Sequence, residues 1–123
     1  MIACIIEFGV KPGRDPDRAR LLAELFAEIE TVDGFLSKDT FEDVARPGRR
    51  ITISYWADAA ALRDWTRNPA HRRAIGQGQR EIFSHYAIRI ARIERAIDWA
   101  APGRPAEGPA RRRSIAVPGR RRV

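Results

Sequence analysis

The chain has 123 residues, of which 44% are hydrophobic, and this supports one domain with a modest core. No apolar run approaches the length of a membrane span, and the apolar N-terminus lacks the basic start and the cleavage site of a signal peptide. The net charge of +7 comes almost entirely from the residues after 100, where seven arginines accompany one acidic residue. A charge-based argument for nucleic-acid binding therefore concerns that segment alone.

The first expected element is a strand over Ile2–Val10, where Ile, Val, Phe and Cys dominate. A turn is predicted after it at Lys11-Pro12-Gly13, since Pro12 fixes φ and Gly13 accepts a positive φ. Cys4 is the only cysteine, and its place in an apolar strand predicts a buried, unreactive thiol. A free thiol fits a reducing compartment, so we expect a cytoplasmic protein.

The clearest helix is predicted over residues 15–30. Asp15 is expected to be its N-cap and Pro16 its first helical residue. Apolar side chains recur at spacings of three and four residues, which predicts a single stripe packed on a flat surface. This stripe consists of Leu22, Leu25, Phe26 and Ile29.

Residues 35–43 alternate in character, which predicts a half-exposed strand. Its two faces are expected to carry Phe35, Ser37, Asp39 and Phe41 on one side and Leu36, Lys38, Thr40 and Glu42 on the other. After a turn at Pro47-Gly48, a returning strand is expected over residues 51–56. Its two faces carry Ile51, Ile53 and Tyr55 on one side and Thr52, Ser54 and Trp56 on the other. We expect Trp56 to pack in a dimer interface.

Two helices are predicted next. Asp58 is the expected cap of a short helix over Ala59–Arg67, which carries Trp65. Asn68 and Pro69 then act as N-cap and first residue of another helix that runs to about residue 82 and places His71 at its third position. Two glycines at 76 and 78 weaken this helix, and we expect them to permit a close approach to the backbone.

The last strand is predicted over residues 86–97, with a helix as the second interpretation. Tyr86, Ile88 and Ile90 are expected on one of its faces. We expect the folded domain to comprise residues 1–98 and a Pro/Gly/Arg-rich tail or arm to comprise residues 99–123. A solubilising or dimer-strapping arm is favoured over a nucleic-acid-binding tail, because the arginines lack interleaved aromatic residues for base stacking.

The element order β-α-β-β-α-α-β predicts an α+β fold, a ferredoxin-like sandwich whose antiparallel sheet carries its helices on one face. The first, third and last strands have apolar residues on both faces. The uncovered face would then expose a large apolar patch, so we expect a homodimer with the two sheets packed face to face.

These residues together resemble the antibiotic biosynthesis monooxygenase family of the dimeric α+β barrel superfamily. The resemblance covers residues 1–98 and is carried by Lys11-Pro12-Gly13, Gly34-Phe35, Tyr55-Trp56 with Asp58, Trp65, Asn68-Pro69 with His71, and Phe83 to Tyr86. It implies a homodimer with a pocket in each protomer between sheet and helices. It also implies oxidation of a small phenolic, quinol or polyketide-like aromatic by O₂, with no metal and no other cofactor.

Such oxygenation needs aromatic walls, one base and a group that stabilises a phenolate in a site of low dielectric. His71 is the first candidate for the base and Trp65 for the aromatic partner, with His85 as an alternative base. The candidate substrate-binding residues are Tyr55, Phe83, Tyr86 and Arg72, and Arg73 and Arg89 are alternative phenolate partners. The structural interpretation is that Trp65 anchors the core and that His71 is a neutral histidine at a helix N-terminus.

Two other functions remain open. One is a non-enzymatic dimeric small-ligand-binding or stress-associated protein of the same fold. The other, the haem degradation of a related branch, is disfavoured because that branch pairs its tryptophan with an asparagine on the first strand. Here that strand has Ile6 and Glu7, and His71 lies a turn too early for the histidine that binds haem.

Overall fold

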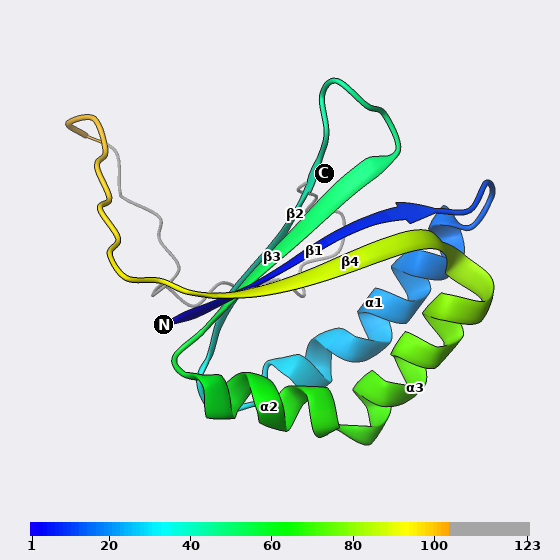
Figure 1. The fold of residues 1–123 in the computed structure, drawn as a ribbon, viewed down its shortest axis with the longest axis horizontal. Coiled ribbons are helices and arrows are strands. Elements are labelled where there is room, and N and C mark those ends of the chain that lie inside the picture. Colours follow the sequence, from blue (N-terminus) through cyan, green and yellow to red (C-terminus); the bar gives the residue numbers. More distant parts are fainter. Residues whose placement is uncertain (104–123) are drawn as a thin grey trace.

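The computed structural model describes residues 1–103 and has a four-stranded sheet with all its helices below one face (Figure 1). The elements in chain order are β1 (Ile2–Val10), α1 (Asp15–Ile29), β2 (Phe35–Glu42), β3 (Arg49–Trp56), α2 (Ala59–Arg67), α3 (Pro69–Gln77), the π-helical turn η1 (Gly78–Ile82) and β4 (Phe83–Arg92). The expected order is thus confirmed. The arginine-rich part of the tail, from residue 104 onward, lies outside the described residues.

The strands lie in the order β2-β3-β1-β4, and each neighbouring pair is antiparallel. This order, with helices on one side, is the predicted ferredoxin-like α+β sandwich. Among residues 1–103, no helix lies on the opposite face, which is called the open face below (Figure 1). Within residues 1–103, none of the helices combines the length and the hydropathy that a membrane span requires.

A bulge in β2 changes which of its side chains face the helices. Phe35 is paired with Trp56 but Ser37 with Tyr55, so Leu36 is an extra residue in the strand. The bulge puts Phe35 on the same face as Lys38, because Lys38 is paired with Ser54 on the helix side. The simple alternation expected from the sequence, which separates Phe35 from Lys38, is therefore wrong.

Trp56 is a core residue, contrary to the expectation that it packs in a dimer interface. Its side chain is 0% exposed and faces the helices, where it packs edge-on against Phe35 at 5.3 Å between ring centres. Its indole N–H donates to the Ser54 hydroxyl at 2.9 Å, so its polar atom is satisfied inside the core. The core around it contains Ile2, Cys4, Ile29, Phe35, Ala61, Leu62 and Trp65.

Two of the three α-helices begin at a capping side chain, and the third does not. Asp58 caps α2 by accepting from the Ala61 N–H, and Asn68 caps α3, both as predicted. Asp15 is not the cap of α1, because the helix already includes it and no side chain caps its start. The carboxylate of Asp15 instead accepts a hydrogen bond from Arg50 of β3, which ties the start of α1 to the sheet.

The helix after Asn68 ends differently from the expected regular helix. It changes at Gly78 into a π-helical turn, in which the Phe83 N–H donates to the Gly78 carbonyl. A side chain at Gly78 would meet the Phe83 ring at 2.5 Å, so this glycine does permit a close approach. The turn lets β4 begin at Phe83, three residues earlier than predicted.

The last strand also ends earlier than predicted, at Arg92 rather than residue 97. The N–H of Ile93 donates to the Met1 carbonyl at 2.9 Å, and this bond is the last between the two strands. From there to residue 103 the chain has no regular structure, and the side chains of Ile97 and Trp99 are exposed. The pairing of β4 with β1 thus ends at the pair Ile2 and Arg92.

Candidate functional site

Trp65 and His71, the two predicted catalytic residues, lie in contact on the helix side of the sheet. Trp65 is 6% exposed in α2, and its ring centre is 4.8 Å from that of His71, at an angle of 53°. Asn68 brings them together, because it ends α2 and its side-chain oxygen accepts from the Ala70 and His71 N–H groups at the start of α3. Helix capping thus positions this pair.

The environment of His71 keeps its imidazole neutral near neutral pH. Burial lowers the pKa of His71 below its ordinary value, and the positive charge of Lys38 lowers it further. A hydrogen bond to the Thr66 backbone opposes both effects in part. Its Nδ1 atom is buried and has no hydrogen-bond partner among the described residues. A neutral ring with an unpaired buried nitrogen could accept or donate a hydrogen bond to a bound molecule.

Phe83 and Tyr86 form a second aromatic group at the other end of β1. The Phe83 ring packs edge-on against Phe8 at 5.4 Å and against Tyr86 at 6.1 Å. The Tyr86 hydroxyl is hydrogen-bonded to the side chain of Gln79 in η1. This group also lies on the helix side, because Tyr86 is paired with Phe8.

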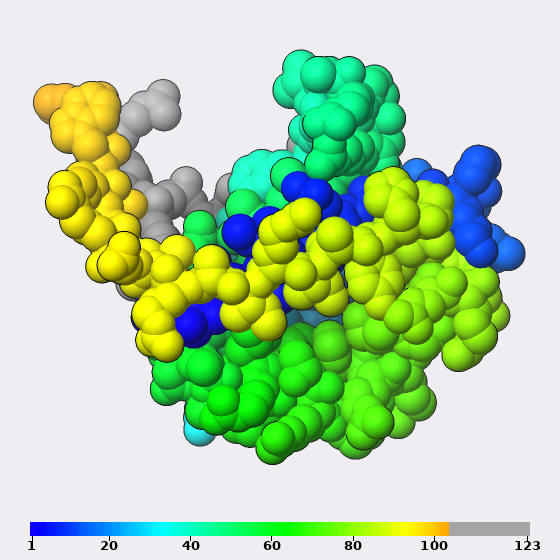
Figure 2. All heavy atoms as spheres, viewed as in Figure 1, coloured from blue at the N-terminus to red at the C-terminus, as the bar shows by residue number. Residues whose placement is uncertain are grey.

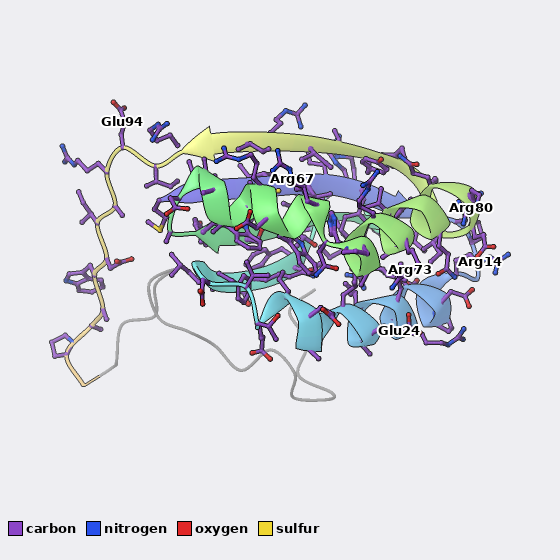
Figure 3. All side chains as sticks on the ribbon, turned by 90° about the horizontal axis from the view of Figure 1, so that it is seen from below. Arg14, Glu24, Arg67, Arg73, Arg80 and Glu94 are labelled. Carbon is purple, nitrogen blue, oxygen red and sulfur yellow. The ribbon has the colours of Figure 1, made fainter. Side chains whose placement is uncertain are left out.

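Tyr55 and Arg72 do not join these residues. Tyr55 is paired with Ala3 on the open face of the sheet, on the side opposite to Trp65. Arg72 is exposed on α3, as is Arg73, which is one of the arginines labelled along the helix layer in Figure 3. Arg89 forms an ion pair with Glu7 at 3.3 Å on the open face.

A polar band crosses the middle of the helix-facing side of the sheet, and we define it as Lys38, Thr40, Thr52 and Ser54. Three of its members have hydroxyl groups that are already satisfied. Thr40 and Thr52 bond to each other at 2.8 Å, and Ser54 accepts from the Trp56 indole. The fourth member, Lys38, is the interior cation that sequence reasoning did not select.

Lys38 extends from β2 toward the helices, where its ammonium lies 5.5 Å from the centre of the Phe26 ring in α1. Burial and the nearby charge of Arg18 lower the pKa of Lys38 from 10.5 to about 8, although Cys4 has a small opposing effect. Burial also raises the pKa of the Cys4 thiol, so this group stays protonated at neutral pH, as expected from the sequence. The interior therefore contains a titratable amine near a neutral histidine.

The signal that could have identified Lys38 was present in the sequence. A lysine in the middle of a strand is unusual, because strand interiors favour β-branched and aromatic residues. The alternation alone could not show its direction, since the bulge at Leu36 shifts the register by one residue.

The helix side of the sheet is open to solvent along β4. In the space-filling view, the surface is hollowed between β4 and the helices α2 and α3 (Figure 2). Ile88 and Ile90 face this side but remain 46% and 62% exposed. A small apolar molecule that entered here would contact isoleucine side chains before it reached the polar band. Among residues 1–103, no three His, Cys, Asp or Glu side chains group in a way that could hold a metal ion.

The comparisons with known proteins agree on one family. A sequence profile described as antibiotic biosynthesis monooxygenase matches residues 1–77. A jasmonate monooxygenase of Pyricularia oryzae is 24% identical over 97 residues, which cover 79% of this chain and 45% of that protein. The chain thus spans less than half the length of this relative. A Bacillus subtilis protein of uncharacterised function, YqjZ, is 32% identical over 91 residues, which cover 74% of this chain and 78% of that protein.

Solved structures share the fold. A crystal structure from Deinococcus radiodurans superposes with a TM-score of 0.71 at 18% identity, and covers 82% of this chain and 100% of its own. SnoaB, a cofactor-independent oxygenase from Streptomyces nogalater, superposes with a TM-score of 0.67 at 12% identity, and covers 78% and 95%. At such identities the likeness concerns the fold alone.

Proposed function

This chain belongs to the antibiotic biosynthesis monooxygenase family, and we propose that it is a cofactor-independent monooxygenase that oxidises a small phenolic or quinol compound with O₂. The observation that carries the proposal is the contact between Trp65 and His71 beside the polar band, inside the helix layer. This interior combines aromatic surface, a neutral imidazole and a buried amine.

The proposed reaction begins when the substrate loses its phenolic proton. The electron-rich anion then passes one electron to O₂, and the two radicals combine to form a carbon–oxygen bond. Loss of water from the peroxide leaves a quinone-type carbonyl, so one oxygen atom enters the product and the other leaves as water. The protein's part is to accept the proton, hold the ring and exclude bulk water.

The test is O₂ consumption by the purified full-length protein with a panel of hydroquinones and anthrone-type phenols, without added metal or flavin. We expect protein-dependent O₂ uptake together with the absorbance of a quinone product. Anaerobic mixing is the control, and it should give no product. No uptake, with quenching of tryptophan fluorescence by the same compounds, would contradict the proposal and favour the non-enzymatic ligand-binding alternative.

A variant sharpens this test. We expect Trp65→Phe to lower turnover roughly tenfold or more, which corresponds to about 1.4 kcal/mol of barrier, because the smaller ring leaves substrate and His71 less well held. Trp99→Phe is the matched control, since this tryptophan is 82% exposed beyond the last strand. Equal turnover of both variants would rule out a functional role for Trp65.

We also propose that the protein acts as a homodimer that buries the open face of the sheet. This face carries the half-buried apolar side chains of Ile5, Ile51, Ile53 and Tyr55, and Phe41 at its edge is 46% exposed. No helix covers them within the described residues. An apolar sheet face of this kind is stabilised when a second sheet packs against it.

A further inference from the structure

Almost all of the basic residues in this chain are arginines. It contains 21 arginines but only two lysines, Lys11 and Lys38. Arginine stays charged at any physiological pH, whereas lysine can lose its proton when it is buried. Lys11 is near the surface, and its ammonium donates to the Arg80 carbonyl at 3.2 Å. Lys38 is therefore the one amine that the fold encloses between the sheet and the helices.

The surroundings of Lys38 leave its charge uncompensated. Among residues 1–103, no carboxylate forms a salt bridge with its ammonium. The charged or titratable groups that face it are Arg18 from α1, Cys4 from β1 and His71 from α3. From β3 it is faced by the hydroxyl-bearing Ser54, its direct cross-strand partner. A buried cation with these neighbours is stabilised by any anion that enters.

We propose that Lys38, in its neutral form, accepts the phenolic proton of the substrate and that the ammonium so formed then holds the phenolate. This inference rests on the proposed function and names the group that its first step requires. The substrate O–H bond breaks, its electron pair stays on oxygen, and the proton forms a new bond to Nζ. After O₂ has added, the ammonium returns this proton to the peroxide oxygen, so Lys38 is neutral again when water leaves.

The proton affinities of the two candidate bases favour Lys38 over His71. An ordinary phenol has a pKa of about 10, as in tyrosine. Transfer to an amine with a pKa of about 8 is uphill by roughly two pKa units, whereas transfer to His71, whose pKa is lowered below 6.5, is uphill by more than three. His71 is better suited to donate or accept a hydrogen bond beside the ring. In this proposal, His71 positions the ring through a hydrogen bond and Lys38 transfers the proton.

The experiment uses 4-nitrophenol, whose phenolate absorbs at longer wavelength than the phenol, as a probe of protonation. The probe is titrated with pH in the presence of the full-length protein, its Lys38→Met variant and its Lys11→Met variant. We expect the wild type and Lys11→Met to lower the apparent pKa of the bound probe by about one unit or more, about tenfold in acidity. Lys38→Met should abolish this shift. An unchanged shift in Lys38→Met, or no binding by the wild type, would overturn the proposal.

A second measurement does not depend on how Lys38→Met folds. Protein labelled with ¹³C-lysine in the Lys11→Arg background has a single lysine side-chain signal, which reports Lys38 directly. We expect this signal to titrate near pH 8 in the free protein and at higher pH once nitrophenolate is bound. Titration at the ordinary value near 10.4, or no change with the probe, would contradict the proposal.

These outcomes separate the inference from the proposed function. If the wild type oxidises quinols and Lys38→Met does so at an equal rate, the oxygenase function stands and the role of Lys38 is overturned. If the wild type consumes no O₂ but shifts the probe through Lys38, the oxygenase function fails while the phenolate-binding role of Lys38 is supported.

Discussion

Lys38 is held in the interior at a cost to the stability of the fold. Its pKa is 10.5 in an unfolded chain and about 8 in the folded protein, because burial and Arg18 disfavour the charged form. Above pH 10.5 both states are neutral and the group has no effect. As the pH falls toward 8, the unfolded chain binds a proton that the folded protein does not, so stability decreases. Below pH 8 the deficit is constant.

Replacement of this lysine should therefore stabilise the protein. At pH 7 we expect Lys38→Met to raise the free energy of unfolding by about 2 to 3 kcal/mol, and at pH 10 by only about 1 kcal/mol. Urea unfolding of wild type and variant at the two pH values measures this difference, with Lys11→Met as the control. A destabilised Lys38→Met at pH 7 would show that the amine has an anionic partner in the folded protein.

At the scale of elements, the order of strands and helices could be predicted, but the orientation of β2 and the ends of β4 could not. Periodicity and capping residues such as Asp58 and Asn68 act locally, so the sequence displays them directly. The bulge at Leu36 depends on the pairing of β2 with β3, which no local pattern reveals. For this reason the sequence does not show that Lys38 faces the helices, whereas the capping residues do place Trp65 and His71 on two successive helices.

The junction between α2 and α3 can be tested through its cap. Asn68→Ala removes the acceptor for two backbone N–H groups, at 2.8 and 3.2 Å, and we expect a loss of about 1 kcal/mol of stability. This corresponds to a decrease in Tm of roughly 4 to 8 °C for a domain of this size. Asn68→Asp keeps the acceptor oxygen and should retain most of the stability. Equal Tm values for wild type and Asn68→Ala would refute the proposed role of the cap.

At the scale of the whole molecule, the two faces of the sheet differ in what covers them and in which side chains they carry. The helix side contains the core and the candidate site, and the open face presents apolar side chains around Glu7, which is paired with Arg49 at 3.1 Å and with Arg89. The Glu7 carboxylate would be buried in a dimer, and it already has two arginine partners within one chain. The proposed dimer would therefore bury no isolated charge there.

A charge in the apolar part of this face should prevent the association. We expect wild type to elute as a dimer in size-exclusion chromatography with light scattering, and Ile53→Asp to elute as a monomer, because an unpaired carboxylate would be buried against the second sheet. Ala23→Asp, on the exposed side of α1, is the matched control and should remain dimeric. A monomeric wild type would exclude the proposed dimer.

The bond between Ile93 and Met1 brings the beginning of β1 next to the end of β4. The two ends of the folded sheet are thus neighbours in space, and a short linker between residue 93 and Met1 would join them. New ends could be opened in the exposed turn at Pro47-Gly48, because exposed turns tolerate such cuts. A circularly permuted chain of this design would keep every strand pairing and would lack residues 94–123, so that the two parts of the sequence could be studied separately.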